Sequence, residues 1–203
     1  MTKQDRAQRT RAALIETAAG EFAREGYAGA ALSRISKAAG TSVGAVTFHF
    51  DSKADLASAV VDRAVEAGRA VVDRAAATEG PPLRRLTAVV LGLARAADAD
   101  VAVRCAARLE RDDAVGDAGR WRETWWPVVR RLAQEAHQGG DLPGAVSPGG
   151  TADLAALFIR SIGMHVEGSD DPGRADGGSG AAHLARLWQI TQPGMADRGP
   201  GED

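Results

Sequence analysis

Side chains that could bind a metal or act as nucleophiles are scattered along this 203-residue chain. The four histidines, His49, His137, His165 and His183, have no second ligand at the spacing of a metal site, which favours exposed or hydrogen-bonded histidines. We therefore predict no metal. The single cysteine, Cys105, lies on an apolar helical segment, and we interpret it as an inert core thiol, with a redox sensor as the alternative.

The acidic and glycine-rich segments also give no catalytic pattern. Glu110, Asp112 and Asp113 resemble a solvated loop cluster rather than the acid and base of a catalytic cleft. The Gly-Gly pairs follow predicted helices and lack the lysine of a phosphate-binding loop. We therefore predict that the protein is not an enzyme and uses no cofactor.

The composition predicts an all-α protein. Hydrophobic residues make up 44% of the chain, enough for a sizeable core, whereas only 4% of the residues are aromatic. The strands of sandwiches and barrels need more aromatic and β-branched side chains than that. One cysteine and no apolar run of about 18 residues argue against a disulfide scaffold and a membrane span, so we expect a cytoplasmic protein.

Charge is distributed unevenly between the two ends of the chain. Residues 1–50 contain 7 Lys or Arg and 4 Asp or Glu, whereas residues 51–203 contain 18 and 23. Nucleic-acid binding depends on a local basic face rather than on the net charge of −2. This small basic surplus permits a nucleic-acid partner but is weak evidence for one by itself.

Apolar residues recur at helical spacing in about nine segments. Ser33, Ser42 and Ser52 are placed to cap the second, third and fourth helices, and Pro127 is expected to kink the seventh or shift its boundary. The first four predicted helices span about 10–25, 32–39, 43–48 and 52–77, and the fifth begins at about residue 82. The last four span about 100–111, 120–137, 151–166 and 181–191.

Three parts of the chain follow from this pattern. We expect a three-helix domain over residues 1–50, a larger helical domain over 51–192, and a disordered tail over 193–203. The first domain contains two short helices joined by residues 39–42, which have the length of a helix-turn-helix and place Gly40 in the turn. On this geometry alone, DNA binding and an ordinary helix pair are equally supported.

The run from Ala38 to Leu56 resembles the signature of the TetR family of bacterial transcriptional repressors. It contains Phe48-His49-Phe50 and Ser52-Lys53, with Ile35 and Gly26-Tyr27 upstream at the family's spacing. In that family the third helix enters the major groove while neighbouring helix ends hold phosphates. The resemblance implies that residues 1–50 are a helix-turn-helix DNA-binding domain and that residues 51–192 are an effector-binding and dimerisation domain.

The resemblance implies DNA contacts at eight positions. Those at the groove are Ser42, Val43, Gly44 and Thr47; those at the backbone are His49, Lys53, Ser33 and Thr10. Val43 stands where a lysine is common in the family, and Thr47 where a tyrosine is common. A valine offers only apolar contact, for example with a thymine methyl, so the operator preference is expected to differ from that of close relatives.

The second half of the chain resembles the γ-butyrolactone receptor branch, which controls antibiotic production in actinomycetes. The similar segments are 100–109, 183–188 and 194–195, together with the tryptophans of the seventh helix. The resemblance implies an apolar pocket between helices, with Trp125 as the preferred wall and Trp121 as the second choice. Candidate walls are Leu86, Val90, Val103, Phe158 and Ile162, and Ser161 is a candidate hydrogen-bond donor. Without the resemblance, core packing is the better explanation of these tryptophans.

Ala64 affects which effector is expected. Receptors for a butyrolactone can carry a glutamine at this point of the fourth helix, so an antibiotic or a pathway intermediate is an alternative effector, as in a pseudo-receptor. We predict a homodimer, joined through the eighth and ninth helices, that binds a pseudo-palindromic operator in double-stranded DNA and is released by a small hydrophobic effector. A helical small-molecule carrier without DNA binding and a repressor of multidrug efflux are the alternative functions.

Overall fold

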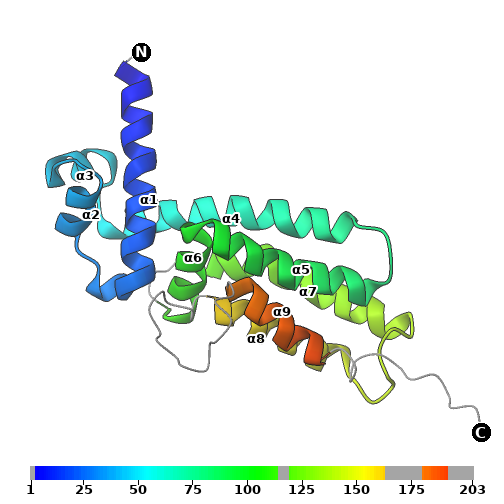
Figure 1. Cartoon of the computed structure of the whole chain (residues 1–203). Helices are drawn as coiled ribbons and strands as arrows, with labels where there is room; N and C mark the ends of the chain where they lie inside the picture. Colours follow the sequence, from blue (N-terminus) through cyan, green and yellow to red (C-terminus); the bar gives the residue numbers. More distant parts are fainter. Residues whose placement is uncertain (1–2, 114–118, 163–179, 192–203) are drawn as a thin grey trace, which may run out of the picture.

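The computed structural model describes residues 3–113, 119–162 and 180–191, and the regular structure within these ranges is entirely helical (Figure 1). This confirms the predicted all-α class. The helices are α1 (Lys3–Gly29), α2 (Leu32–Ala38), α3 (Val43–His49), α4 (Lys53–Ala77), α5 (Pro82–Ala99), α6 (Val101–Arg111), α7 (Gly119–Gln138), α8 (Pro148–Ser161) and α9 (Gly180–Thr191).

Helices α1 to α3 form a head at one end of the molecule, and α4 to α9 form an elongated bundle (Figure 1). The head comprises residues 3–50. Helix α4 starts beside the head and packs against α1, α5, α6 and α7. It carries ten buried residues, with Leu56, Val60 and Ala64 among those that are fully buried, so one long amphipathic helix joins the two regions.

The first helix is longer than the sequence pattern predicts, because it begins at Lys3 instead of about Thr10. The predicted stop at Gly26 is confirmed as a break in helical geometry, with φ of 72° and ψ of 172°. A positive φ is accessible to glycine at little cost. Tyr27 follows this break and stacks on Phe22 with the ring centroids 5.8 Å apart.

The predicted caps are right for two helices and wrong for one. Ser42 accepts a hydrogen bond from the Ala45 amide at 3.2 Å, and Ser52 accepts one from the Asp55 amide at 3.1 Å. The predicted cap at Ser33 is wrong: α2 has Ala31 at its N-cap and no capping side chain of its own. Its start is stabilised instead by Glu21 of α1, which accepts a hydrogen bond from the Ala31 amide.

The later helices differ from the prediction at two points. Helix α8 begins at Pro148 instead of about 151, because the Ser147 hydroxyl caps it by accepting the Gly150 amide at 3.0 Å. Helix α7 continues through Pro127, so the proline does not set a helix boundary. The predicted tail, 193–203, and the end of the predicted eighth helix, 163–166, lie outside the described residues.

Candidate DNA interface and effector region

The four residues predicted to contact the groove form one exposed surface on α3 and its N-cap. Ser42, Val43, Gly44 and Thr47 are all exposed, and Val43 retains 43% of its accessible surface. Val46, on the opposite side of the helix, is 1% exposed and anchors α3 to the core. The short helix therefore presents a continuous outer face.

The turn between α2 and α3 depends on Gly40, which has φ of 65°. Its amide donates to the Lys37 carbonyl at 3.1 Å, and the Thr41 amide donates to the Ser36 carbonyl at 2.9 Å. These bonds close α2 in the manner of a glycine C-cap, after which Ser42 starts α3. The local sequence thus accounts for the angle at which α3 leaves α2.

A buried carboxylate on α1, which the sequence pattern did not reveal, holds α2 in place. Glu21 is 4% exposed and forms ion pairs with Arg24 and Arg34. Its Oε1 also accepts the Ala31 amide at 3.4 Å, at the start of α2. Glu21 therefore supplies from another helix the acceptor that α2 lacks in its own sequence.

Lys53 has an internal role that the resemblance did not imply. Its ammonium donates to the carbonyl oxygens of Tyr27 at 2.8 Å and Ala30 at 3.1 Å, and it lies 4.5 Å from the centre of the Tyr27 ring. These contacts satisfy carbonyls at the end of α1 and tie that end to the first turn of α4. An ammonium has three donors, so the predicted phosphate contact requires the third.

His49 and Phe48 lie together at the end of α3. The rings of His49 and Phe48 are 5.2 Å apart in a T-shaped arrangement, and His49 is half-buried. Phe48 is 81% exposed, more than any other large apolar side chain in the described part of the chain. The sequence pattern does not reveal this exposure, since helical periodicity does not tell which of the aromatic residues Phe48 and Phe50 faces the core.

The sequence predicts Thr10 at the start of the first helix, and this is wrong, because Thr10 lies inside α1. Helix α1 begins seven residues earlier, so the Thr10 amide is internal to the helix. The Thr10 hydroxyl donates to the Arg6 carbonyl at 3.0 Å. Ser33, by contrast, is exposed in the first turn of α2, where backbone amides lack partners within the helix.

The residues predicted to line an effector pocket are distributed over α5, α6, α7 and α8, and each of these helices contacts the other three. Most of them lie in the core, with exposures of 0% for Leu86, Val103, Trp121 and Trp125, 2% for Val90 and 4% for Ile162. Phe158 is partly buried and packs edge-on against Trp188 of α9, with 5.1 Å between ring centroids. The Ser161 hydroxyl donates to the Phe158 carbonyl at 2.7 Å.

The two buried tryptophans of α7 have different surroundings. Trp121 lies against α4 so closely that a Cβ on Gly68 would be 2.6 Å from its ring atom Cζ3. Trp125 is fully buried, and its Nε1 has no hydrogen-bond partner among the described residues. A buried donor without a partner carries a free-energy cost, which a bound acceptor would remove.

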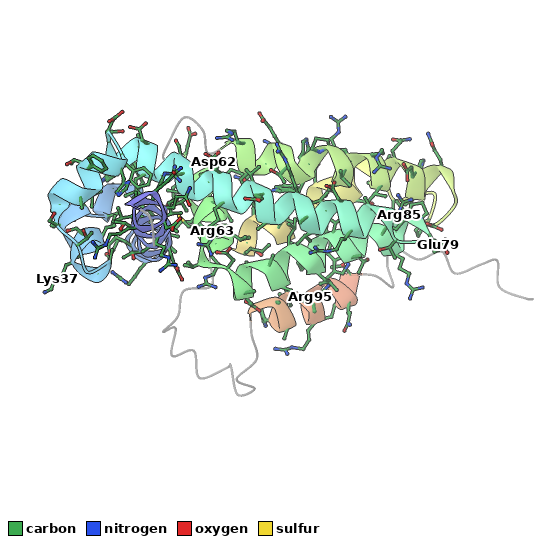
Figure 2. All side chains as sticks on the ribbon, turned by 90° about the horizontal axis from the view of Figure 1, so that it is seen from above. Lys37, Asp62, Arg63, Glu79, Arg85 and Arg95 are labelled. Atoms are coloured by element: carbon green, nitrogen blue, oxygen red, sulfur yellow. The ribbon has the colours of Figure 1, made fainter. Side chains whose placement is uncertain are left out.

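Two hydrogen bonds connect the head to α6, and two ion pairs connect the first half of α4 to the rest of the bundle. The Arg108 guanidinium of α6 donates to the Ala23 carbonyl at 2.7 Å and the Arg24 carbonyl at 3.0 Å, immediately before the break at Gly26. Farther along, Arg63 pairs with Asp100 at 3.1 Å and Asp62 pairs with Arg120 at 2.6 Å. Asp62 and Arg63 lie near the head end of α4 (Figure 2).

Two ionisable groups of α6 have altered acidity. Burial raises the pKa of the Cys105 thiol to about 12, although the Arg108 charge acts in the opposite direction. A thiol with this pKa is protonated at neutral pH and is a poor nucleophile. Burial also raises the pKa of Glu110, and the nearby charges of Arg160 and Arg122 reduce that rise.

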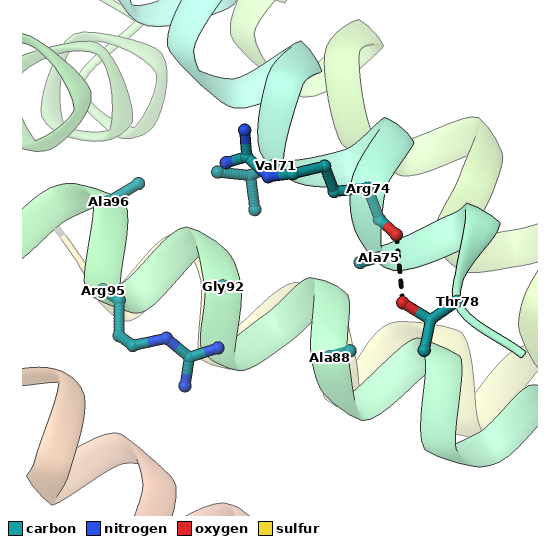
Figure 3. Close-up of a pocket in the computed structure, with 8 residues that line it drawn as sticks. All are labelled: Val71, Arg74, Ala75, Thr78, Ala88, Gly92, Arg95 and Ala96. Atoms are coloured by element: carbon teal, nitrogen blue, oxygen red, sulfur yellow. Dashed lines mark hydrogen bonds between the residues drawn. The ribbon is translucent and has the colours of Figure 1, made fainter.

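A surface groove between α4 and α5 has a volume of about 430 Å³ (Figure 3). The two helices approach closely here, since a Cβ on Gly92 would lie 2.7 Å from a methyl carbon of Val71. None of the predicted effector residues lines this groove. Its lining consists of Val71, Arg74, Ala75, Thr78, Ala88, Gly92, Arg95 and Ala96.

The sequence of the head matches a known family model. Residues 14–60 match the model described as bacterial regulatory proteins, tetR family. This segment is of the TetR family. The match runs from Leu14 of α1 to Val60 of α4, and so includes the whole helix-turn-helix. It confirms the predicted family, and the description confirms a regulator rather than an enzyme.

The similarity extends beyond the head to the whole chain. The A-factor receptor protein of Streptomyces griseus is 27% identical over 200 residues, which are 98% of this chain and 68% of that protein. A crystal structure of a γ-butyrolactone receptor, an ArpA-like protein, is 25% identical with a TM-score of 0.74, covering 95% of this chain and 90% of the other.

A DNA-bound structure is similar to the same extent. CprB from Streptomyces coelicolor, in complex with its biological operator sequence, is 25% identical with a TM-score of 0.73, covering 95% of this chain and 91% of that one. These similarities confirm the predicted resemblance to the γ-butyrolactone receptor branch. In the part of the chain that the structure describes, no helix is both long and apolar enough to cross a bilayer.

Proposed function

We propose that this protein is a ligand-responsive transcriptional repressor that binds an operator through α3 and leaves it when a small hydrophobic effector binds the bundle. The observation that carries the proposal is the exposed outer face of α3, formed by Ser42, Val43, Gly44 and Thr47, on a head whose sequence matches the TetR family. The similarity to an operator-bound protein over 95% of the chain supports it.

Dimerisation through α8 and α9 is part of this proposal. Leu157 of α8 and Leu187 and Ile190 of α9 are 65%, 40% and 74% exposed, although they are large and apolar. The two helices are joined through the contact between Phe158 and Trp188. An apolar surface on two neighbouring helices suits a second copy of the chain, and a dimer would place two α3 helices about one DNA turn apart.

We place the effector among α5, α6, α7 and α8, next to Trp125. The support is its burial together with its unpartnered Nε1, which suits an effector with an acceptor oxygen on an otherwise apolar body. Ala64 is fully buried on α4, where butyrolactone receptors can carry a glutamine, and this favours an antibiotic or pathway intermediate as effector. Genes of antibiotic or secondary metabolism are the proposed targets.

The route from effector to DNA would run through α4 and α6. Lys53 connects the start of α4 to the end of α1, and Arg108 connects α6 to the same helix. Movement of either helix would shift α1 and with it the angle of α3. Such a mechanism requires that the effector binds the DNA-incompetent conformation more tightly, because equal affinity for both conformations shifts nothing.

A mobility-shift titration tests the proposal. The full-length protein is titrated onto DNA from upstream of its own gene, with and without an extract of small metabolites from the producing culture. A specific shift that the extract releases is expected, and the Trp125→Phe variant is expected to shift the same DNA with a weaker response to the extract. Effector binding without any DNA shift, on this DNA or on duplexes selected from a random library, would support the carrier function instead.

A further inference from the structure

The first part of α1 extends beyond the packed head. Leu14 is the first fully buried residue of the helix, and residues 4–13 are exposed or half-buried. Figure 1 shows these turns standing clear of α2, α3 and α4. We refer to residues 3–11 as the arm. A helical segment that buries little surface gains little from packing, so its sequence is free to serve another purpose.

Helical periodicity gives the arm two different sides. Ala7 and Thr10 continue the line of Leu14 at spacings of three and four residues, and both are half-buried. Arg6 and Arg11 flank this line, one on each side, at about 60–80° around the helix from its centre. Arg9 lies on the far side of the helix. One side of the arm is in line with the buried side of α1. This side therefore carries Arg6 and Arg11, with the small residues Ala7 and Thr10 between them.

Arg11 fixes the position of the arm relative to α3. Its guanidinium lies 5.1 Å from the centre of the ring of Phe50, the residue that ends α3. Arg6 is a further five residues toward the N-terminus, about 7–8 Å along the helix at 1.5 Å per residue. The arm therefore passes the C-terminal end of α3 and continues beyond it. A duplex whose major groove, about 12 Å wide, holds α3 has a phosphate strand near that end.

The charges of the arm fit an external anion better than they fit the helix itself. Arg6, Arg9 and Arg11 outnumber Asp5, and cations at a helix N-terminus oppose the helix dipole. Among the described residues, Arg6 has no ion-pair partner. The same helix end exposes backbone amides that attract anions. A polyanion beside the arm would remove the electrostatic cost of these cations.

We propose that the arm is a second DNA contact, in which Arg6 and Arg11 hold backbone phosphates that flank the groove occupied by α3. This inference rests on the proposed function, because it needs α3 to lie on a duplex. It adds contacts that fix position and affinity without specifying sequence, since phosphates are the same at every base pair. It also assigns a purpose to the turns that extend α1 before its core begins.

The experiment compares arginines on the two sides of the arm. The full-length protein first selects a duplex from a random-sequence library, and its dissociation constant for that duplex is measured across a range of KCl concentrations. The double variant Arg6→Gln/Arg11→Gln should bind about tenfold more weakly, with a salt slope smaller by about 1 for each phosphate that the arm no longer neutralises. Arg9→Gln removes one positive charge on the far side and should leave the slope almost unchanged, whereas Arg6→Gln and Arg11→Gln, each alone, should reduce it.

Duplex length provides a second measurement. Trimming the base pairs that flank the selected site should weaken wild-type binding to the level of the double variant, and it should hardly affect the variant. Circular dichroism and thermal melting confirm that each variant is folded. Equal salt slopes for wild type and the double variant would overturn the arm contact. If the library yields no duplex, or if Thr47→Ala also binds unchanged, the proposed function fails as well.

Discussion

The head and the bundle are stabilised in different ways. In the head, directed polar contacts set the positions of the helices: Ser42 caps α3, Glu21 supports the start of α2, and Lys53 satisfies carbonyls at the end of α1. In the bundle, the fit between neighbouring side chains decides how the helices pack. Trp121, for example, occupies the space beside Gly68, where a larger residue would clash. The comparison shows that directed hydrogen bonds fix the helices that present the exposed face of α3, whereas the apolar interior of the bundle depends on complementary shape.

The same substitution in the two regions should have opposite effects. In Gly68→Ala the new methyl would lie 2.6 Å from the Trp121 ring, so we expect a decrease of about 2–3 kcal/mol in the free energy of unfolding. In Gly20→Ala, in the head, nothing lies within 4 Å of the new methyl, so better helix propensity should stabilise the protein by about 0.5–1 kcal/mol. Chemical denaturation measures both, and a neutral Gly68→Ala would contradict the tight packing.

Removal of the Glu21 carboxylate should destabilise the head without destabilising the bundle. Glu21→Ala leaves Arg34 and the Ala31 amide without their shared acceptor, at an expected cost of about 1–3 kcal/mol. Hydrogen exchange should show reduced protection concentrated in α1 and α2, and DNA binding should weaken with it. Glu25→Ala is the matched control, since Glu25 forms only a surface pair with Arg24 and should cost less than about 1 kcal/mol.

Arg108 tests whether the two regions unfold together. Arg108→Met removes the hydrogen bonds to Ala23 and Arg24, at a cost of about 1 kcal/mol, and should separate the melting of the head from that of the bundle. Arg104→Met removes bonds to Ala97 and Asp98 within the bundle, so its melting should stay as cooperative as in the wild type. Calorimetry distinguishes the two cases. Identical profiles for the two variants would show that the Arg108 hydrogen bonds do not couple the two regions.

The smallest expected effect concerns the pH dependence of the bundle. Because burial raises the pKa of Glu110 above its value in the unfolded chain, the folded state binds this proton more tightly. The contribution of Glu110 to stability is therefore greatest below its unfolded pKa and is lost as the pH rises through its folded pKa. Glu110→Gln should raise the melting temperature slightly at pH 7 and should not raise it near pH 4. A lower melting temperature at pH 7 would show that pairing with Arg160 and Arg122 outweighs burial.

The elements of the head were predictable because their determinants are close together in the sequence. Gly40 supplies the positive φ of the turn, Ser42 caps the helix that follows it, and both lie within a few residues of the backbone they control. Glu21 was not predictable in the same way, because its partner at Ala31 belongs to another helix. For the same reason Ser33 was wrongly predicted as a cap, since a sequence motif cannot show that an acceptor from elsewhere has already taken that role.

The bundle was predictable only as a set of helices with apolar faces. The burial of Trp121 and Trp125 follows from helical spacing, but nothing in the sequence indicates that Gly68 is the residue that accommodates Trp121. The unpartnered Nε1 of Trp125 depends on what surrounds it in the bundle. Because apolar packing is not directional, sequence patterns give the buried face of each helix without giving its neighbour.

By itself, the sequence determined the all-α class, the helix-turn-helix of the head, the exposed residues of α3 and the resemblance to a receptor family, because periodicity, caps and turn glycines act over a few residues. Only the tertiary structure decided that Lys53 is bonded to the end of α1, that Arg108 connects the bundle to the head, and that the arm extends past α3. These features join residues separated by 23 to 85 positions, and which of them meet depends on how the whole chain packs.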